Sequence, residues 1–190
     1  TFYKGLPYRL KPSQRLVSSL FDMTPECFPE YFPLSRFRSP HANKMGWLKK
    51  SDAIISISQA SADDLIFLDS SLASKLKVIH LATQIDLVAP EQIPNLLGNR
   101  FWLMVGKRRS YKNALTLYRA LQRFNQNKAI LVVAGGEPWG NKDERWLATP
   151  ELRNRIMPLR ANDQQLAWLY RNAEAVLVPS LAEGFSLPLI

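Results

Sequence analysis

Four cationic side chains crowd into one short turn of the sequence, GKRRSYKN at residues 106–113. The turn follows an apolar run, residues 101–105, and precedes the amino terminus of a helix expected over 113–124. Free N–H groups at a helix amino terminus and nearby cations both favour negative charge, so this turn suits a diphosphate. A solvated basic turn is the alternative, and the residues alone leave both open. The cations are Lys107, Arg108, Arg109 and Lys112.

A second polar stretch, PSLAEGFSLPLI at residues 179–190, follows the last apolar run of the sequence. It places Glu183 on a turn just before a helix whose first residues we expect at 186–188. Backbone N–H groups there can donate to phosphate or sugar oxygens, and a nearby carboxylate can accept from sugar hydroxyls. This combination favours a nucleotide sugar as the ligand.

Two further stretches are weaker candidates. The glycines of GGEPWG, residues 135–140, allow close backbone approach to a ligand, and a tight turn is the alternative. The stretch lacks the glycine spacing of a dinucleotide fingerprint or a P-loop, and we expect Trp139 not to line a cleft. Asp22 opens the proline-rich stretch 22–33 and could approach an acceptor, but such an aspartate is at least as often a turn or capping residue. The same alternative applies to Glu26 and Glu30.

Metal chemistry is not indicated. The two histidines, His41 and His80, and the single cysteine, Cys27, show no ligand spacing typical of zinc. We therefore expect neither a metal site nor a cofactor.

Alternating strands and helices must position these stretches. In the first half we expect strands at 15–22, 53–58 and 77–80, and helices at 37–50 and from a Ser58 or Ser61 cap to 68. The proline-rich stretch is expected to be neither regular helix nor central strand. In the second half we expect strands at 101–105, 129–136, 155–159 and 175–179, and helices at 113–124, 143–154 and 163–172. The first of these helices should face the core with Leu115, Leu117, Leu121 and Phe124.

The apolar runs rich in Val, Leu and Ile predict parallel sheets covered on both faces, in an α/β fold with two Rossmann-like domains. A stretch with several chain breakers, around residues 86–99, is the expected linker. We therefore expect domains at 1–95 and 96–190.

Composition narrows the class of protein. With 190 residues, 46% of them hydrophobic, the chain can bury a core. No window approaches the roughly 20 apolar residues of a membrane span, and the single cysteine favours a reducing cytoplasm. The net charge of +9 favours phosphates, nucleic acid or anionic lipid as partners without choosing among them.

Taken together, these stretches resemble the family 4 glycosyltransferases of the GT-B fold, over most of residues 16–190. The resemblance implies two Rossmann-like domains, both incomplete in this chain. It also implies retaining, metal-independent transfer from a nucleotide sugar to a glycan or lipid-linked acceptor in polysaccharide biosynthesis. The segments that carry it are VGKRRSYKN, AGG, LAWLYRNAEAVLVPSLAEGFSLPLI, FDMTPECFPEYF and SDAIISISQASADDL.

The resemblance also implies roles for single residues. Lys112 would meet the donor diphosphate, with Gly106 giving it room and Lys107 or Arg109 beside it. Glu183 matches the first glutamate of the family's Glu-x7-Glu motif and would bind sugar hydroxyls, and Asp22 would serve the acceptor side. Lys112, Glu183 and Asp22 are the expected catalytic residues. The other donor-binding residues implied are Gly184, Phe185 and Ser186, through backbone groups, and Leu187 beside the nucleotide.

Three positions depart from the family pattern. Tyr111 stands where an arginine commonly precedes the lysine, so Lys107, Arg108 or Arg109 is expected to supply the second cation. Phe21 precedes Asp22 where many members have histidine, which puts a histidine contact in doubt. Ser186 replaces the last glycine of EGFG, which is tolerable if its N–H group is what matters. The second glutamate of the motif would fall one residue past Ile190, so we expect a piece of a longer protein that is inactive alone.

Other functions remain open at this point. A basic nucleic-acid or membrane-binding module is one alternative, although no RNA-binding aromatic signature appears, and we expect no specific nucleic acid. A nucleotide-sugar binder without turnover is another. For the enzyme we expect a cytoplasmic location, with peripheral contact to an anionic membrane bearing a lipid-linked acceptor.

Overall fold

The computed structural model describes residues 11–32, 43–124, 129–136, 138–140 and 145–190. Its contacts divide the chain into two units. The first unit comprises Thr1–Ala82 with Ala182–Ser186, and the second comprises Thr83–Leu181 with Leu187–Ile190. The expected domain boundary at residue 95 stays a prediction.

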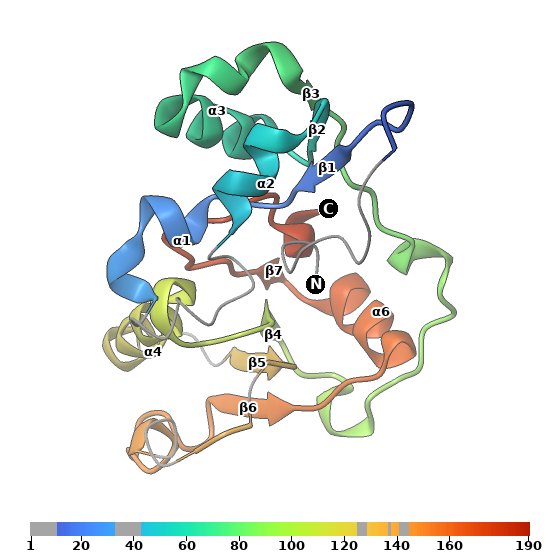
Figure 1. Cartoon of the computed structure of the whole chain (residues 1–190). Coiled ribbons are helices and arrows are strands. Elements are labelled where there is room, and N and C mark those ends of the chain that lie inside the picture. Colours follow the sequence, from blue (N-terminus) through green and yellow to red (C-terminus); the bar gives the residue numbers. More distant parts are fainter. Residues whose placement is uncertain (1–10, 33–42, 125–128, 137, 141–144) are drawn as a thin grey trace. The chain divides into compact units, whose positions relative to one another are not determined.

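The first unit is built on a three-stranded parallel sheet in the order β1-β2-β3 (Figure 1). The strands are β1 Val17–Leu20, β2 Ala53–Ser56 and β3 Leu76–Val78. The helices are α2 Lys44–Lys50 and α3 Gln59–Leu68, followed by a 3-10 turn at Ser70–Lys75. Leu20, Leu48, Ile54 and Leu65 are fully buried between them, so the expected strands and helices of this half have formed around one core. The part of the expected helix at 37–42 lies outside the described residues.

The helix α3 begins at Ser58, one of the two caps that the sequence allowed. The Ser58 hydroxyl accepts a hydrogen bond from the backbone N–H of Ser61 at 3.0 Å. This contact satisfies a donor that the first helical turn leaves free, which fixes where the helix starts.

The proline-rich stretch contains short helices, so the prediction of no regular helix there is wrong. Its two turns are α1 Thr24–Cys27 and a 3-10 turn at Pro29–Tyr31. A proline stands in the first turn of each, where its missing N–H group costs no hydrogen bond.

The second unit is built on a four-stranded sheet in the order β6-β5-β4-β7, with every neighbouring pair parallel. The strands are β4 Phe101–Val105, β5 Ile130–Ala134, β6 Ile156–Leu159 and β7 Ala175–Val176. Alternate residues of β5 enter different clusters: Leu131 and Val133 pack with α4 Ala114–Arg123, and Val132 and Ala134 pack with α6 Asp163–Asn172 (Figure 1). The sheet is therefore parallel and covered on both faces, as the sequence predicts.

Three details of the second half differ from the prediction. The strand expected at 175–179 is limited to Ala175–Val176. In α4 the fully buried positions are Ala114, Tyr118 and Leu121, while Leu115 and Phe124 are exposed. The helix expected at 143–154 is helical at 145–147 and continues as turns, its first two residues lying outside the described part. A proline at position 150 explains the early end, because it cannot continue the ladder of helical hydrogen bonds.

Part of the expected linker is packed. Ile93 and Leu96 are 7% and 1% exposed, and both belong to the core on the α6 side of the second unit. The intervening chain forms a 3-10 turn at Pro94–Leu96.

Candidate functional site

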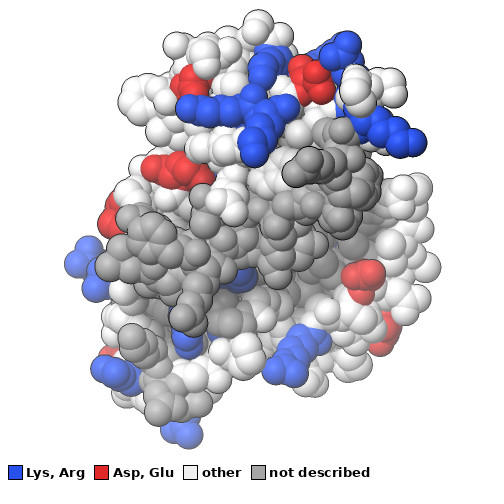
Figure 2. Space-filling model, viewed as in Figure 1, with Lys and Arg blue, Asp and Glu red and all other residues white. Residues whose placement is uncertain are grey.

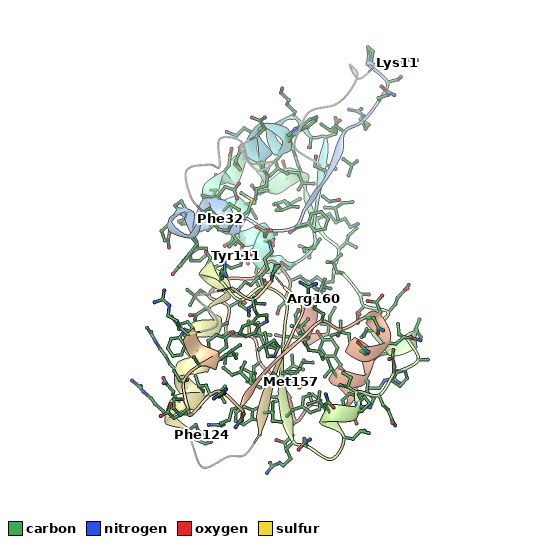
Figure 3. All side chains as sticks on the ribbon, turned by 90° about the horizontal axis from the view of Figure 1, so that it is seen from below. Lys11, Phe32, Tyr111, Phe124, Met157 and Arg160 are labelled. Atoms are coloured by element: carbon green, nitrogen blue, oxygen red, sulfur yellow. The ribbon has the colours of Figure 1, made fainter. Side chains whose placement is uncertain are left out.

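The second unit has a topological switch point between β4 and β7. From β4 the chain adds β5 and β6 on one side of the sheet and then places β7 on the other. Ligands of open parallel sheets bind outside the carboxyl ends of the strands at such a point. Tyr111, which follows β4, and Arg160, which follows β6, lie toward one end of this unit, and Phe124 lies toward the other (Figure 3).

The cationic turn lies at this end and is folded tightly. Gly106 has φ 102°, which a residue with a side chain rarely adopts, and its N–H group donates to the Ala134 carbonyl at 2.9 Å. A 3-10 turn at Ser110–Lys112 follows, and Ser110 and Asn113 have φ angles of 57° and 55°. The turn therefore leads from β4 into α4 through several left-handed residues.

Two hydrogen bonds tie the cationic turn to the segment that follows β7. The Asn113 amide donates through Nδ2 to the Pro179 carbonyl at 3.2 Å, and the Leu181 N–H group donates to the Tyr111 carbonyl at 2.8 Å. The turn and the start of the 179–190 stretch are thus neighbours, as the switch point requires. The sequence prediction did not include Asn113, although asparagine directly after the lysine is a usual choice for a left-handed residue.

The four cations of the turn do not share one environment. Lys107 and Arg109 are exposed, and Lys112 is half-buried with its Nζ 5.2 Å from the centre of the Tyr111 ring. Arg108 is 3% exposed, and its guanidinium contacts protein groups. Of the predicted donor residues, the turn therefore brings together Gly106, Lys107, Arg109 and Lys112.

The other predicted donor residues fall on both sides of the division into units. Glu183, Gly184, Phe185 and Ser186 are grouped with the first unit, whereas Leu187 opens a 3-10 turn at Leu187–Leu189 in the second. That residues 183–186 meet Leu187 and the cationic turn around one donor stays a prediction.

Within the first unit, the stretch from 182 to 186 contacts the loop after β2. The Gly184 carbonyl accepts from the hydroxyls of Ser58 and Ser61, the latter at 3.3 Å. The Phe185 ring lies 5.8 Å from the His80 ring. Ser186 has φ 61°, and its buried Oγ has no hydrogen-bond partner among the described residues. These contacts hold the EGF segment beside the carboxyl end of β2.

Asp22, the predicted acceptor-side residue, follows β1 in the first unit. Its Oδ1 accepts from the Thr24 N–H group at 3.0 Å, so Asp22 has the turn role that the sequence allowed, while Met23 is the residue that precedes α1. The Lys44 ammonium donates to the Asp22 carbonyl at 2.8 Å and forms an ion pair with Glu26 at 2.6 Å. Lys44 is 1% exposed. No sequence pattern predicts this burial, because lysine is almost never buried unless it is paired.

Burial and nearby carboxylates change the acidity of two groups in the first unit. Burial, together with Asp63 and Asp22, raises the pKa of the Asp64 carboxyl. Burial, together with Asp64 and Glu26, likewise raises the pKa of the Cys27 thiol, which makes a reactive thiolate unfavourable there.

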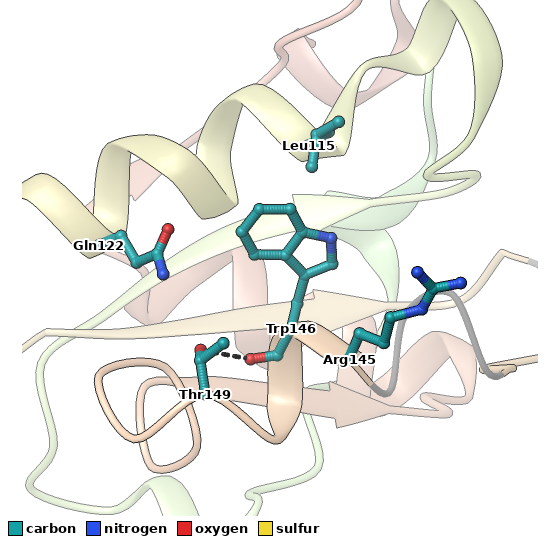
Figure 4. A pocket seen from close by; sticks show the side chains of 5 residues that line it. All are labelled: Leu115, Gln122, Arg145, Trp146 and Thr149. Carbon is teal, nitrogen blue, oxygen red and sulfur yellow. Dashed lines mark hydrogen bonds between the residues drawn. The ribbon is translucent and has the colours of Figure 1, made fainter.

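A cavity of about 620 Å³ lies elsewhere in the second unit, between α4 and the segment 145–149 (Figure 4). No predicted site residue lines it; its walls come from Leu115, Gln122, Arg145, Trp146 and Thr149. In the part of the chain that the structure describes, no three His, Cys, Asp or Glu side chains are grouped to hold a metal ion. No helix among the described residues is long and apolar enough to cross a membrane.

Comparison with known proteins gives one family. Residues 89–190, more than half of the chain, match the family model described as glycosyl transferases group 1. The chain is 26% identical over 200 residues to the O-antigen chain mannosyltransferase B of Escherichia coli, covering 97% of this chain and 51% of that protein. The chain thus spans about half the length of this curated relative.

Solved structures share the fold. A crystal structure of Anabaena Alr3699/HepE in complex with UDP and glucose matches with a TM-score of 0.68 and 23% identity, over 91% of this chain and 48% of that one. The lipopolysaccharide outer core galactosyltransferase WaaB matches with a TM-score of 0.54 and 21% identity, over 75% and 41% of the two chains. At these identities the likeness concerns the fold, which is that of Rossmann-like GT-B domains.

Proposed function

Because the chain belongs to the glycosyl transferases group 1 family, we propose that the full-length protein transfers a sugar from a nucleotide-sugar donor. The observation that carries this proposal is the cationic turn after β4, tied by two hydrogen bonds to the segment after β7. A diphosphate bound there would meet the positive end of the α4 dipole and the cations of the turn.

The proposed chemistry is stabilisation of the leaving group. Sugar transfer with retention builds negative charge on the departing nucleoside diphosphate and positive charge on the sugar. Lys112, with Lys107 and Arg109 beside it, would neutralise the diphosphate without a metal ion. Glu183 would bind sugar hydroxyls, and the backbone of 184–186 would meet sugar and phosphate, with Leu187 beside the nucleotide.

The acceptor side is proposed for the first unit. Asp22 follows β1 at the carboxyl end of a parallel sheet, where side chains meet ligands. A glycan or lipid-linked saccharide is the acceptor class we propose, in polysaccharide biosynthesis. The named activities of the relatives support this class, since they include an O-antigen chain mannosyltransferase and a lipopolysaccharide galactosyltransferase. We also propose membership of glycosyltransferase family 4.

Charge on the first unit supports peripheral contact with an anionic membrane on its cytoplasmic side. Lys and Arg gather over α2 in Figure 2. Lys49 and Lys50 form the last turn of α2, and the Lys75 ammonium donates to the Lys49 carbonyl at 2.9 Å. Lys49 is paired with Asp69 at 3.0 Å, so the proposed attraction rests on Lys50 and Lys75, at about 1 kcal/mol each near an anionic surface.

A donor screen on the full-length protein tests the proposal. Product formation is measured with a panel of nucleotide sugars and a lipid-linked saccharide acceptor. We expect Lys112→Met and Glu183→Gln each to lower kcat by roughly 100-fold or more, as loss of a charge-stabilising contact does in other enzymes. The control is Arg123→Met, which removes an exposed cation at the far end of α4 and should leave turnover unchanged.

Other outcomes would redirect the assignment. Nucleotide-sugar binding with no product for any acceptor would indicate a binder without turnover. DNA binding with steep salt dependence, unaffected by nucleotide sugar, would indicate a nucleic-acid module instead.

A further inference from the structure

Arg108 is the buried member of the cationic turn. It is 3% exposed, whereas its neighbours Lys107 and Arg109 are exposed. Burying a guanidinium is costly unless its N–H groups are hydrogen-bonded, so its contacts identify what the side chain is used for.

Three contacts of the guanidinium lie in the turn that follows β5. Nη1 donates to the Gly135 carbonyl at 3.2 Å, and Nη2 donates to the Pro138 carbonyl at 3.2 Å. The guanidinium carbon lies 4.4 Å from the centre of the Trp139 ring, within the range of a cation–π contact. One side chain thus joins the turn after β4 to the turn after β5.

The surroundings of the guanidinium are shaped to fit it. A Cβ atom at Gly136 would lie 3.2 Å from Nη1 of Arg108 and would also meet the Gly106 backbone, so this position has no room for a side chain. The Trp139 ring packs in turn on the Tyr118 ring of α4, with centres 6.4 Å apart and planes at 27°. The guanidinium and two rings therefore form a continuous stack from the cationic turn to α4.

The backbone of Arg108 contributes to the same arrangement. Its carbonyl accepts a hydrogen bond at 3.0 Å from the N–H group of Ala114, the first residue of α4. The main chain of Arg108 thus holds the start of α4 while its side chain holds the neighbouring turn. Movement of either contact would shift the helix amino terminus and the cations beside it.

We propose that Arg108 is a positioning residue, which fixes the cationic turn through the Gly135 and Pro138 carbonyls and Trp139 and does not itself contact the diphosphate. This inference rests on the proposed function, in which Lys107, Arg109 and Lys112 bind the donor diphosphate. It assigns different tasks to two adjacent arginines: Arg109 binds the diphosphate, and Arg108 holds the cationic turn against the turn after β5.

The binding test uses the full-length protein with UDP and GDP as probes, titrated by calorimetry. Arg108→Lys keeps the charge but loses the fork of donors, and Trp139→Leu loses the ring but removes no charge. We expect each variant to weaken binding about tenfold, and the double variant to be no weaker than either single one, because both act through one contact. Arg123→Met, an exposed cation on α4 outside the turn, is the control and should bind as the unaltered protein does.

A direct phosphate contact gives the opposite pattern. Arg108→Met would then lose more affinity than Arg108→Lys, because only the lysine keeps a positive charge on the phosphate, and Trp139→Leu would have no effect. That result would overturn the proposal. So would strictly additive losses in the double variant, because independent contributions add when residues do not act together.

Hydrogen exchange without ligand separates this inference from the proposed function. In Arg108→Lys and in Trp139→Leu we expect faster exchange in peptides covering 106–114, with unchanged exchange in α6. If the unaltered protein binds neither UDP nor GDP, the proposed function loses its support while faster exchange at 106–114 still supports the positioning role. Unchanged exchange there would overturn it. An equal rise in α6 would show general destabilisation and would overturn it as well.

Discussion

Replacing Lys44 by methionine should loosen the loop that carries Asp22. The Lys44 side chain is 1% exposed and holds both the Asp22 carbonyl, at 2.8 Å, and the Glu26 carboxylate, at 2.6 Å. Methionine has a similar length and no charge, so the substitution removes both contacts while filling most of the space.

The expected loss in the free energy of unfolding depends on the Glu26 carboxylate and the Asp22 carbonyl, which the substitution leaves without their partner. Removing one partner of a buried ion pair costs about 3–5 kcal/mol, because the other charge stays unpaired. The Glu26 side chain is 19% exposed, which allows some hydration and favours the lower end of that range. The orphaned Asp22 carbonyl adds about 1 kcal/mol, and the apolar methionine recovers a similar amount. We therefore expect a loss of about 3 kcal/mol in the free energy of unfolding of this region.

Native-state hydrogen exchange on the full-length protein measures this loss locally, in peptides covering 21–32 and 43–50. Lys50→Met is the control, since Lys50 is an exposed lysine on the same helix and surface substitutions usually stay within about 0.5 kcal/mol. The double variant Lys44→Met/Glu26→Met leaves no unpaired charge and should return to within about 1 kcal/mol of the unaltered protein. A loss below about 1 kcal/mol in the single variant, or a double variant no better than the single one, would refute this account of the ion pair.

Two further substitutions test how Asp64 in α3 and Gly136 after β5 contribute to the stability of the fold. Because burial and nearby carboxylates raise the pKa of Asp64, the folded state holds its proton to a higher pH than the unfolded state does, and its stability falls as pH rises from the ordinary carboxyl pKa of about 4. Asp64→Asn should therefore raise Tm at pH 7 and lose that advantage below about pH 4, so an equal gain at both pH values would contradict the assignment. Gly136→Ala should cost about 3 kcal/mol in urea unfolding, since its φ is 79° and a Cβ there meets the Gly106 backbone. Gly98→Ala, at φ 73° with open space around it, is the control and should cost only the conformational part, about 1 kcal/mol.

The strands of the second half could be predicted closely because each is a short apolar run bounded by polar residues. The run 101–105 became β4 with the same bounds, and the helix expected at 163–172 became α6. The phase of α4 was harder to predict, since its sequence offers more apolar residues than one helix face can hold. Packing against the sheet selected Ala114, Tyr118 and Leu121, leaving Leu115 on the other side.

For the candidate site, the sequence predicted the position of the turn but not the direction of its side chains. Where β4 ends is decided by neighbouring residues, so the cationic turn could be located from local pattern alone. Whether an arginine in it points outward depends on residues near 135–139, which become neighbours when β5 pairs with β4. The burial of Lys44 has the same origin, because its partners Asp22 and Glu26 lie about 20 residues away along the chain.

Backbone conformation gives an independent argument for where the site lies. Among the described residues, those with a left-handed backbone that are not glycine are Ser110, Asn113 and Ser186. A serine adopts this conformation at a cost of about 1–2 kcal/mol, and asparagine adopts it more readily, so the contacts around the two serines must hold them there. All three fall in the two stretches assigned to the donor, and Ser186 stands where the family usually has glycine. This last observation explains the departure: the position requires a left-handed backbone, and a small side chain can adopt it at a modest cost. Strain of this kind collects at ligand sites, so its restriction to these stretches supports both of them as donor-binding.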